Sequence, residues 1–230
     1  MAALDFLWGE RQEQPTRPEY ILGLDLGKAA DFTALCVLET RVSAPDFIAG
    51  PEAVYHCKWL QRFKLGSGYP HIVLSVREMC RREPLLTFTP RLAIDQSGVG
   101  AAVVDMFRQG EINADLQPIL IHGGDRATNE GGVWRCPKRE LVGITQVMLQ
   151  SGRIKIPNVL PEAGVLKQEL QNFQVSISDA GHDSYEARVG KHDDLVLALA
   201  MALWLAARHQ EKLRALDPEL VQLISNYRGR

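Results

Sequence analysis

One short segment near the amino terminus limits the possible folds of this chain more than any other. Residues Tyr20–Leu26 read Tyr-Ile-Leu-Gly-Leu-Asp-Leu, an almost continuous apolar run that contains one acid, Asp25. Such a run is typical of a β-strand that is buried on both faces. The sheet that contains it therefore needs other elements packed above and below it.

The rest of the chain predicts a mixed α/β architecture. Apolar runs and alternation predict strands, and apolar residues at helical spacing, bounded by Pro or Gly, predict helices. Three early strands, the first two paired as an antiparallel hairpin, precede alternating helices and strands, which predicts a mixed sheet with helices on its faces. The expected strands are 20–26, 33–38, 53–60, 91–95 and 117–122, and the expected helices are 71–82, 101–109, 137–151, one from 161, and a long last one opened by 191–194.

Two further segments carry predictions of their own. Residues 173–177 and 185–189 alternate around a polar link, which predicts an additional β-hairpin in the C-terminal half. Residues 122–134 contain four glycines and mixed charges, so we expect a mobile loop there. For the whole chain we expect a leader or linker at 1–19, one domain at 20–210 and a tail at 211–230.

The composition excludes several classes of protein. Hydrophobic residues make up 46% of the 230 residues, which excludes disorder over most of the length. The formal charge of -2 excludes a basic coat protein, so binding of a polyanion needs a local basic patch or metal ions. The longest apolar run, 195–207, is shorter than the about 20 residues of a membrane helix. Scattered cysteines without a Cys-x-x-Cys pair, and no signal peptide, favour a cytoplasmic protein with reduced thiols and no membrane partner.

Four acids stand out by their positions. Asp25 lies inside the first buried strand, Asp95 ends the strand 91–95, and Asp193 and Asp194 open the last helix. Each of the last three can be a turn or helix cap, which is a common role for Asp. A cap does not need two consecutive acids, however. Capping also does not explain Asp25, because a buried carboxylate is costly unless it is paired or binds a metal.

Together these positions favour carboxylates that converge on hard cations such as Mg²⁺ or Mn²⁺. Two such ions about 3.5–4 Å apart can activate a water and stabilise the leaving oxygen of a phosphodiester. The predicted metal ligands are Asp25, Asp95 and the pair Asp193 and Asp194, and the sequence does not decide which of that pair is the inner ligand. His192, just before the pair, can orient a water or bind a metal, or only form a local hydrogen bond.

Basic residues gather at the start of the helix 137–151. Arg135, Lys138 and Arg139 lie there, and a helix start with nearby cations is a good phosphate site. Arg153 and Lys155 can extend that surface. The alternative for all five is ordinary solvated charge.

A set of short motifs resembles the nuclease domain of large terminase subunits, the DNA-packaging proteins of tailed phages. The set spans about residues 20–207, and its specificity comes from the order of the pieces rather than from any single one. The matching pieces are Gly23–Gly27 with Thr33, Ala93–Gly100, Cys136–Val142, Leu149–Ile156, Glu169–Phe173, Gly181–Arg188 and His192–Leu195.

This resemblance implies an RNase H-like fold that cuts double-stranded DNA, with Asp25, Asp95 and the pair Asp193 and Asp194 as the metal-binding acids. It also implies a packaging ATPase domain, a small terminase subunit and a portal as partners in the cytoplasm of a host cell. The sequence contains no Gly-x4-Gly-Lys-Ser/Thr phosphate loop, however. We therefore expect the nuclease without the packaging ATPase, as an excised domain or a stand-alone relative.

Other functions remain open from the residues alone. The turn Asp25-Leu-Gly27 and the acid-plus-glycine turn 95–100 also fit an actin-like or sugar-kinase-like ATPase, although such proteins usually need two lobes and a longer chain. A non-catalytic DNA-binding module with the same fold would bind DNA without metal-dependent cutting. Junction resolvases and transposases fit the acids as well, whereas the middle motifs favour the terminase-like branch.

Overall fold

The computed structural model describes residues 18–27, 31–42, 53–178 and 192–214. This described part contains eight strands and five helices. The strands are β1 (Glu19–Asp25), β2 (Ala34–Val42), β3 (Ala53–Arg62), β4 (Arg91–Asp95), β5 (Asp115–His122), β6 (Thr128–Glu130), β7 (Val133–Pro137) and β8 (Ile154–Lys155). The helices are α1 (Tyr69–Cys80), α2 (Gly100–Gln109), α3 (Lys138–Gln150), α4 (Ala163–Ser178) and α5 (Asp194–Arg214).

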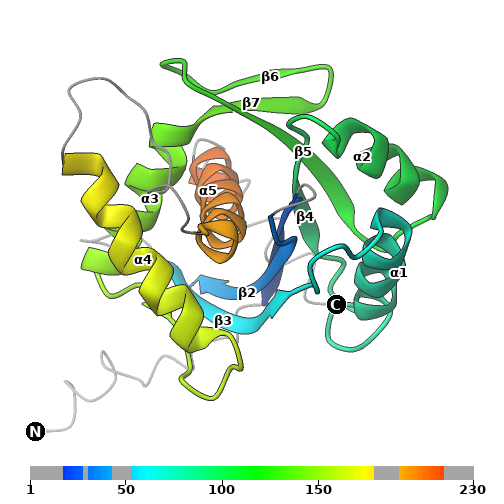
Figure 1. Ribbon diagram of the computed structural model, residues 1–230, viewed down its shortest axis with the longest axis horizontal. Coiled ribbons are helices and arrows are strands. Elements are labelled where there is room, and N and C mark those ends of the chain that lie inside the picture. Colours follow the sequence, from blue (N-terminus) through cyan, green and yellow to red (C-terminus); the bar gives the residue numbers. More distant parts are fainter. Residues whose placement is uncertain (1–17, 28–30, 43–52, 179–191, 215–230) are drawn as a thin grey trace, which may run out of the picture.

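The strands form one mixed sheet in the order β6-β7-β5-β4-β1-β2-β3-β8. The strands β1, β2 and β3 are antiparallel neighbours, whereas β1, β4, β5 and β7 run parallel to one another. In Figure 1 the sheet curves around α5, with α3 and α4 on the same side and α1 and α2 on the other. The predicted mixed sheet with helices on its faces is confirmed, and so is the hairpin of the first two strands.

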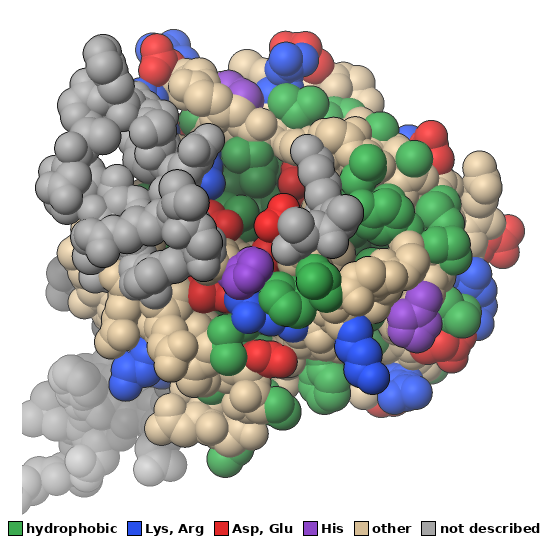
Figure 2. Space-filling model, in the orientation of Figure 1, with side chains coloured by type: hydrophobic (Ala, Val, Ile, Leu, Met, Phe, Trp, Pro, Cys, Tyr) green, Lys and Arg blue, Asp and Glu red, His purple; other side chains and the backbone are tan. Residues whose placement is uncertain are grey.

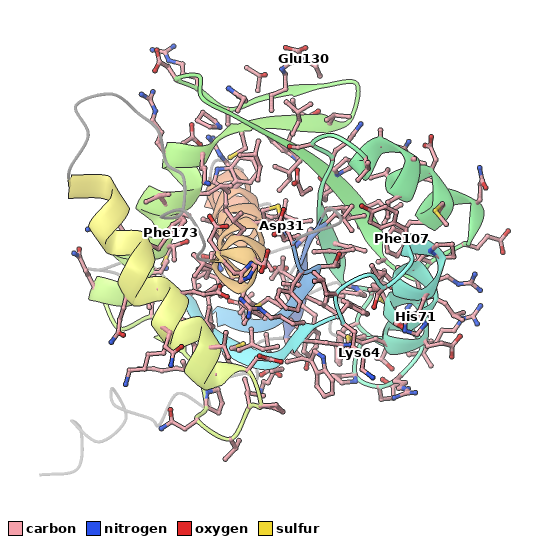
Figure 3. The ribbon with its side chains drawn as sticks, in the orientation of Figure 1. Asp31, Lys64, His71, Phe107, Glu130 and Phe173 are labelled. Carbon is pink, nitrogen blue, oxygen red and sulfur yellow. The ribbon has the colours of Figure 1, made fainter. Side chains whose placement is uncertain are left out.

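Strand β1 contributes to two separate cores, because successive residues of a strand point to opposite faces. Leu22 and Leu24 belong to the core with α1 and α2, which also contains Phe107 (Figure 3). Ile21 belongs to the core around α5. By the same alternation, Asp25 points to the α5 side of the sheet.

Helix α5 crosses β1 at very short range. A Cβ atom added to Gly23 would lie 1.9 Å from the carbonyl oxygen of Ala198 and 3.2 Å from the Cβ atom of Ala202. All residues from Ala198 to Ala206 are buried, so this stretch of α5 is enclosed on every side. A glycine in the strand and alanines on the helix thus permit the contact that centres α5 on the sheet.

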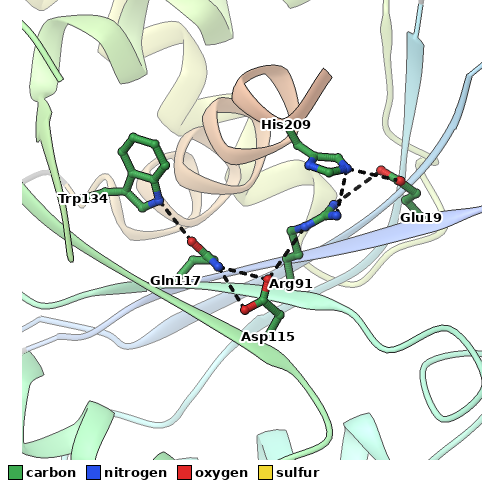
Figure 4. A network of polar contacts seen from close by, with 6 residues as sticks. All are labelled: Glu19, Arg91, Asp115, Gln117, Trp134 and His209. Carbon is green, nitrogen blue, oxygen red and sulfur yellow. Dashed lines mark hydrogen bonds and ion pairs between the residues drawn. The ribbon is translucent and has the colours of Figure 1, made fainter. Parts of the chain in front are cut away.

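The carboxyl-terminal part of α5 is fixed to the sheet by a polar network at the start of β4 (Figure 4). The Nη2 atom of Arg91 lies 2.8 Å from Nε2 of His209, and its Nη1 atom lies 3.5 Å from Glu19. Arg91 also faces Asp115, whose carboxylate accepts hydrogen bonds from Gln117. This network lies at the end of α5 that is remote from Asp194.

The predicted C-terminal-half hairpin is wrong in its first strand. Residues 173–177 continue helix α4, which runs to Ser178, and Phe173 packs against the core around α5 (Figure 3). The apolar spacing of Leu166, Leu170 and Phe173 fits a helix, and this burial prevails over the local alternation. The second predicted strand, 185–189, lies outside the described residues.

The predicted loop 122–134 contains regular structure. Strands β6 and β7 form a tight hairpin within it, and Gly131 and Gly132 between them have φ angles of 59° and 82°. Two consecutive residues with positive φ make a turn whose twist matches a hairpin, so these glycines build a turn rather than a loop.

Two other expectations from composition concern the cysteines and the membrane. All four cysteines are free and buried, as expected for structural thiols. None of the described helices has both the length and the apolar character that a bilayer span requires.

We predict that Gly23→Ala destabilises the protein by about 1–3 kcal/mol, because its methyl group would overlap the backbone of α5. Urea denaturation, monitored by circular dichroism, measures the change in the free energy of unfolding. Gly143→Ala on α3 is the matched control, since a Cβ there meets nothing within 4 Å and alanine favours a helix interior. If both variants kept the stability of the parent protein, the short contact would not constrain the fold.

Candidate functional site

The carboxyl ends of the parallel strands meet at one edge of the sheet, and the candidate residues lie there. Asp25 is the last residue of β1 and Asp95 is the last residue of β4, directly after the paired residues Leu24 and Ile94. Helix α5 begins at this edge with Asp194. In Figure 2, acidic side chains gather near the middle of the face, beside a histidine and basic side chains.

The predicted acids are close enough to influence one another. Burial raises the pKa of the Asp25 carboxyl well above its ordinary value, and the charges of Asp95, Asp194 and Asp193 raise it further. Asp25 is only 6% exposed. The structure therefore brings together the strand acids and the acids of the last helix, which are more than 90 residues apart in the sequence.

Asp95 also caps a turn, which is the alternative to a metal-ligand role that its position suggested. Its Oδ1 atom accepts a hydrogen bond of 2.8 Å from the backbone N–H of Ser97, which shapes the turn after β4. A carboxylate has two oxygens and several lone pairs, so this bond leaves it able to accept further partners. The cap and the proposed ligand role are thus compatible.

Asp194 is the more deeply buried of the helix acids, with 4% of its surface exposed. Burial raises its pKa to about 6, against the opposing effects of Arg62 and His192, and the charges of Asp193 and Asp31 add to the rise. Asp31 lies near the start of α5 (Figure 3). The exposed His192 has its Nδ1 atom 3.7 Å from Oδ2 of Asp194.

Two residues of this site were not predicted as functional. Arg62, the last residue of β3, forms ion pairs with Asp194 and with Glu169 of α4. Burial raises the pKa of Glu169 to about 7, although Arg62 and a hydrogen bond from the Val196 N–H lower it. The spacing contained a signal for Glu169, because it lies on the apolar stripe of its own helix. Arg62 ends a strand and had no such signal.

The basic residues predicted to bind DNA divide into two groups at this edge. Lys138 lies at the acids, with its Nζ atom 3.4 Å from Oδ2 of Asp193. Arg139 instead pairs with Asp125, at 2.8 Å, and Arg135 is exposed on β7. Lys138 is therefore part of the acid cluster, whereas Arg135 and Arg139 lie beside it.

Arg153 and Lys155 do not extend this surface. They lie at or next to β8, at the opposite end of the strand order from β7. The Nε atom of Arg153 donates a hydrogen bond of 2.9 Å to the carbonyl oxygen of Ala53, which ties β8 to β3. In the sequence these residues follow Arg135 after a single helix, α3. That helix carries the chain across the fold, so residues before and after it lie at different ends of the sheet.

The donors at this edge fit hard divalent cations. They are carboxylates, their charges are only partly compensated, and the buried Oδ2 atom of Asp194 has no hydrogen-bond partner. Within the described ranges, however, no three His, Cys, Asp or Glu side chains already form a ligand set for a metal ion. Arg62 and Lys138 provide positive charge there instead.

No protein-family model matches this sequence, and no curated protein is significantly similar to it. Among solved structures, the large terminase nuclease from thermophilic phage G20c is similar, with a TM-score of 0.54 and 19% identity over 82% of this chain and 84% of that one. A structure of that nuclease with bound zinc has a TM-score of 0.50 and 20% identity, over 82% and 83% of the two chains. This likeness establishes a shared fold, which is the fold that the sequence resemblance implied.

We predict that the protein in metal-free buffer becomes less stable as the pH rises from about 5 to 8. The folded-state pKa values of Asp25, Asp194 and Glu169 are raised, so the folded state binds more protons than the unfolded state over this range. Stability that is present below the ordinary pKa values is therefore lost as pH rises through the raised ones. Calorimetry with a chelator measures the Tm at each pH.

Asp25→Asn removes one of these charges and should raise the Tm at pH 8 by a few degrees relative to the parent protein. Asp105→Asn on α2 is the control, because Asp105 is exposed and pairs with the neighbouring Arg108 of the same helix. A difference between Asp25→Asn and the parent that did not grow with pH would contradict the raised pKa of Asp25.

Proposed function

We propose that the protein is a metal-dependent DNA endonuclease that hydrolyses phosphodiester bonds. The observation that carries this proposal is the convergence of Asp25, Asp95 and Asp194 at one sheet edge, where burial and repulsion between acids raise the pKa values of Asp25 and Asp194. A structural cluster of acids would be stabilised by full pairing, whereas an incompletely paired one suits a cationic ligand. The shared fold with a terminase nuclease supports the same assignment.

In this proposal Asp25, Asp95 and Asp194 would hold two divalent ions, Mg²⁺ or Mn²⁺, with Asp193 contributing beside them. Of the two helix acids, Asp194 is the better inner ligand. It is more buried than Asp193, and its charge raises the pKa of Asp25 more strongly. Bound ions would neutralise the phosphodiester and lower the pKa of an attacking water. His192, exposed beside Asp194, would orient that water or accept its proton.

The DNA backbone would be held by the cations beside the acids. Arg135 and Arg139 lie next to the amino terminus of α3, whose free N–H groups also favour phosphate. Lys138, which pairs with Asp193, would contact the phosphate nearest to the reaction.

We also propose that the substrate is double-stranded DNA in a host cytoplasm, and that the protein acts with a packaging ATPase domain, a small terminase subunit and a portal.

We predict that the purified chain nicks and cuts plasmid DNA with Mn²⁺ or Mg²⁺ and not with a chelator. Asp25→Asn and Asp95→Asn should each reduce the rate by about 100-fold or more, because an amide keeps the shape of the side chain and removes the charge. Gel electrophoresis of supercoiled plasmid measures the rate, and Asp105→Asn serves as the control. ATP hydrolysis is measured on the same samples.

The outcomes separate the competing functions. ATP hydrolysis without cutting would favour the ATPase. Binding of DNA without cutting under any divalent ion would favour the non-catalytic module. Cutting at the parental rate by either Asn variant would remove that acid from the ligand set.

We predict that replacing Arg135 and Arg139 together by Ala weakens DNA binding and reduces the slope of its logarithmic salt dependence by about two, one for each lost phosphate contact. Fluorescence anisotropy in Ca²⁺ or a chelator measures binding without cutting. Arg153→Ala is the control because Arg153 lies at the other edge of the sheet. Equal salt slopes for the double variant and the control would place the DNA path elsewhere.

A further inference from the structure

We infer that Arg62 is the positioning residue of the site, which fixes the Asp194 carboxylate by bridging it to Glu169. The inference rests on the proposed nuclease function and assigns roles to two residues outside the expected ligand set. The strand register places Arg62 at the correct edge. Asp25 is paired with Ala34 on β2, and Ala34 is paired with Arg62 on β3. Residues paired in this way point to the same face of a sheet, so Arg62 points toward α5 as Asp25 does.

The guanidinium of Arg62 contacts two acids from two different helices. Its Nη2 atom donates a hydrogen bond to Oε1 of Glu169 on α4, and it lies 3.5 Å from Oδ2 of Asp194 on α5. All three side chains are largely buried, with 16% of the Arg62 side chain and 5% of the Glu169 side chain exposed. An arginine is suited to this contact because the N–H groups of its guanidinium lie in one rigid plane, so a single nitrogen can face two carboxylates at fixed directions.

Glu169 in turn holds the first turn of α5. Its Oε2 atom accepts a hydrogen bond of 3.0 Å from the backbone N–H of Val196, one of the N–H groups that a helix start leaves without an internal partner. Glu169 is therefore a cap that comes from another helix. One carboxylate thus binds both the arginine and the backbone of the helix that carries Asp194.

Arg62 is also supported from its other side. Its guanidinium carbon lies 4.9 Å from the centre of the Phe32 ring, and Phe32 contacts His192 edge to face with ring centres 5.1 Å apart. The arginine is therefore fixed between the turn after β1, helix α4 and the start of α5. This arrangement limits the directions in which the Asp194 carboxylate can point.

A matched arginine at the other end of α5 separates positioning from general stability. Arg91 is also partly buried, at 24% exposure, and also joins the sheet to α5, through His209. It lies far from the acids. Loss of either arginine should weaken the anchoring of the same helix, but only loss of Arg62 should disturb the acid cluster.

The experiment compares Arg62→Met, Arg62→Lys, Glu169→Gln and the control Arg91→Met with the parent protein. Mn²⁺ binding is measured by isothermal titration calorimetry, and cleavage is measured as kcat and KM for duplex DNA. Hydrogen exchange of the peptide that contains residues 194–199 reports on the first turn of α5 in metal-free buffer. Thermal melting shows which variants are folded.

For Arg62→Met we expect Mn²⁺ affinity about 10-fold weaker and kcat about 10–100-fold lower, because misplaced ligands bind and orient less well. KM for DNA should stay within about threefold, since Arg62 is largely buried against carboxylates and is not one of the cations proposed to hold the DNA backbone. Hydrogen exchange in the first turn of α5 should be faster. Arg62→Lys should not restore kcat, because the lysine ammonium lies on a flexible stem and lacks the rigid, planar donor geometry of the guanidinium. Glu169→Gln should show a smaller loss, since its amide oxygen can still accept from Val196.

The control Arg91→Met should have a lower Tm than the parent protein, but its Mn²⁺ affinity and kcat should stay within about threefold of the parent values. Equal or tighter Mn²⁺ binding by Arg62→Met would show that Arg62 only competes with the metal ion for the carboxylates, and it would overturn the inference. Full rescue of kcat by Arg62→Lys would overturn it as well. A parent protein that neither binds Mn²⁺ nor cuts DNA would defeat the proposed function instead. In that case the exchange measurement decides alone, and unchanged exchange in Arg62→Met would overturn the positioning role.

Discussion

The contact between Gly23 of β1 and Ala198 of α5 determines how the last helix lies against the strand that carries Asp25. Because a side chain at position 23 would overlap the helix backbone, the strand and the helix can approach only at this point. Asp25 lies two residues beyond Gly23, and Asp194 lies one helical turn before Ala198. The closest approach therefore places the end of the strand beside the start of the helix. The acids meet as a consequence of packing rather than of any attraction between them.

That meeting has an energetic cost which the rest of the fold offsets. Like charges at short range and burial both disfavour ionised carboxylates, as the raised pKa values of Asp25 and Asp194 show. Arg62 and Lys138 reduce this cost without removing it. The large apolar core around α5 supplies the stability that permits such a cluster. Added divalent cations would relieve the same repulsion, so metal binding and folding stability should be coupled.

The sequence predicted the parts of this structure that depend on local pattern. The apolar run around Asp25 predicted a buried strand, and consecutive acids before a long apolar helix predicted the place of Asp194. Long-range pairing was less accessible. Nothing at the end of β3 indicated that Arg62 would contact two acids, because a charged residue at a strand end usually faces solvent. The hairpin expected from residue 173 failed because helical packing against α5 prevailed over a short alternation.

The two ends of α5 show why the site is at one of them. At the far end, Arg91, His209 and Glu19 contact one another. At the near end the acids Asp25, Asp95, Asp193, Asp194 and Glu169 face the cations Arg62 and Lys138. Four buried polar atoms at this edge also have no hydrogen-bond partner among the described residues, namely Arg62 Nε, Gln96 Oε1, His122 Nε2 and Asp194 Oδ2. Buried polar atoms are normally hydrogen-bonded, so these exceptions need an explanation. A site whose polar groups bind ions, water and a phosphodiester would provide one.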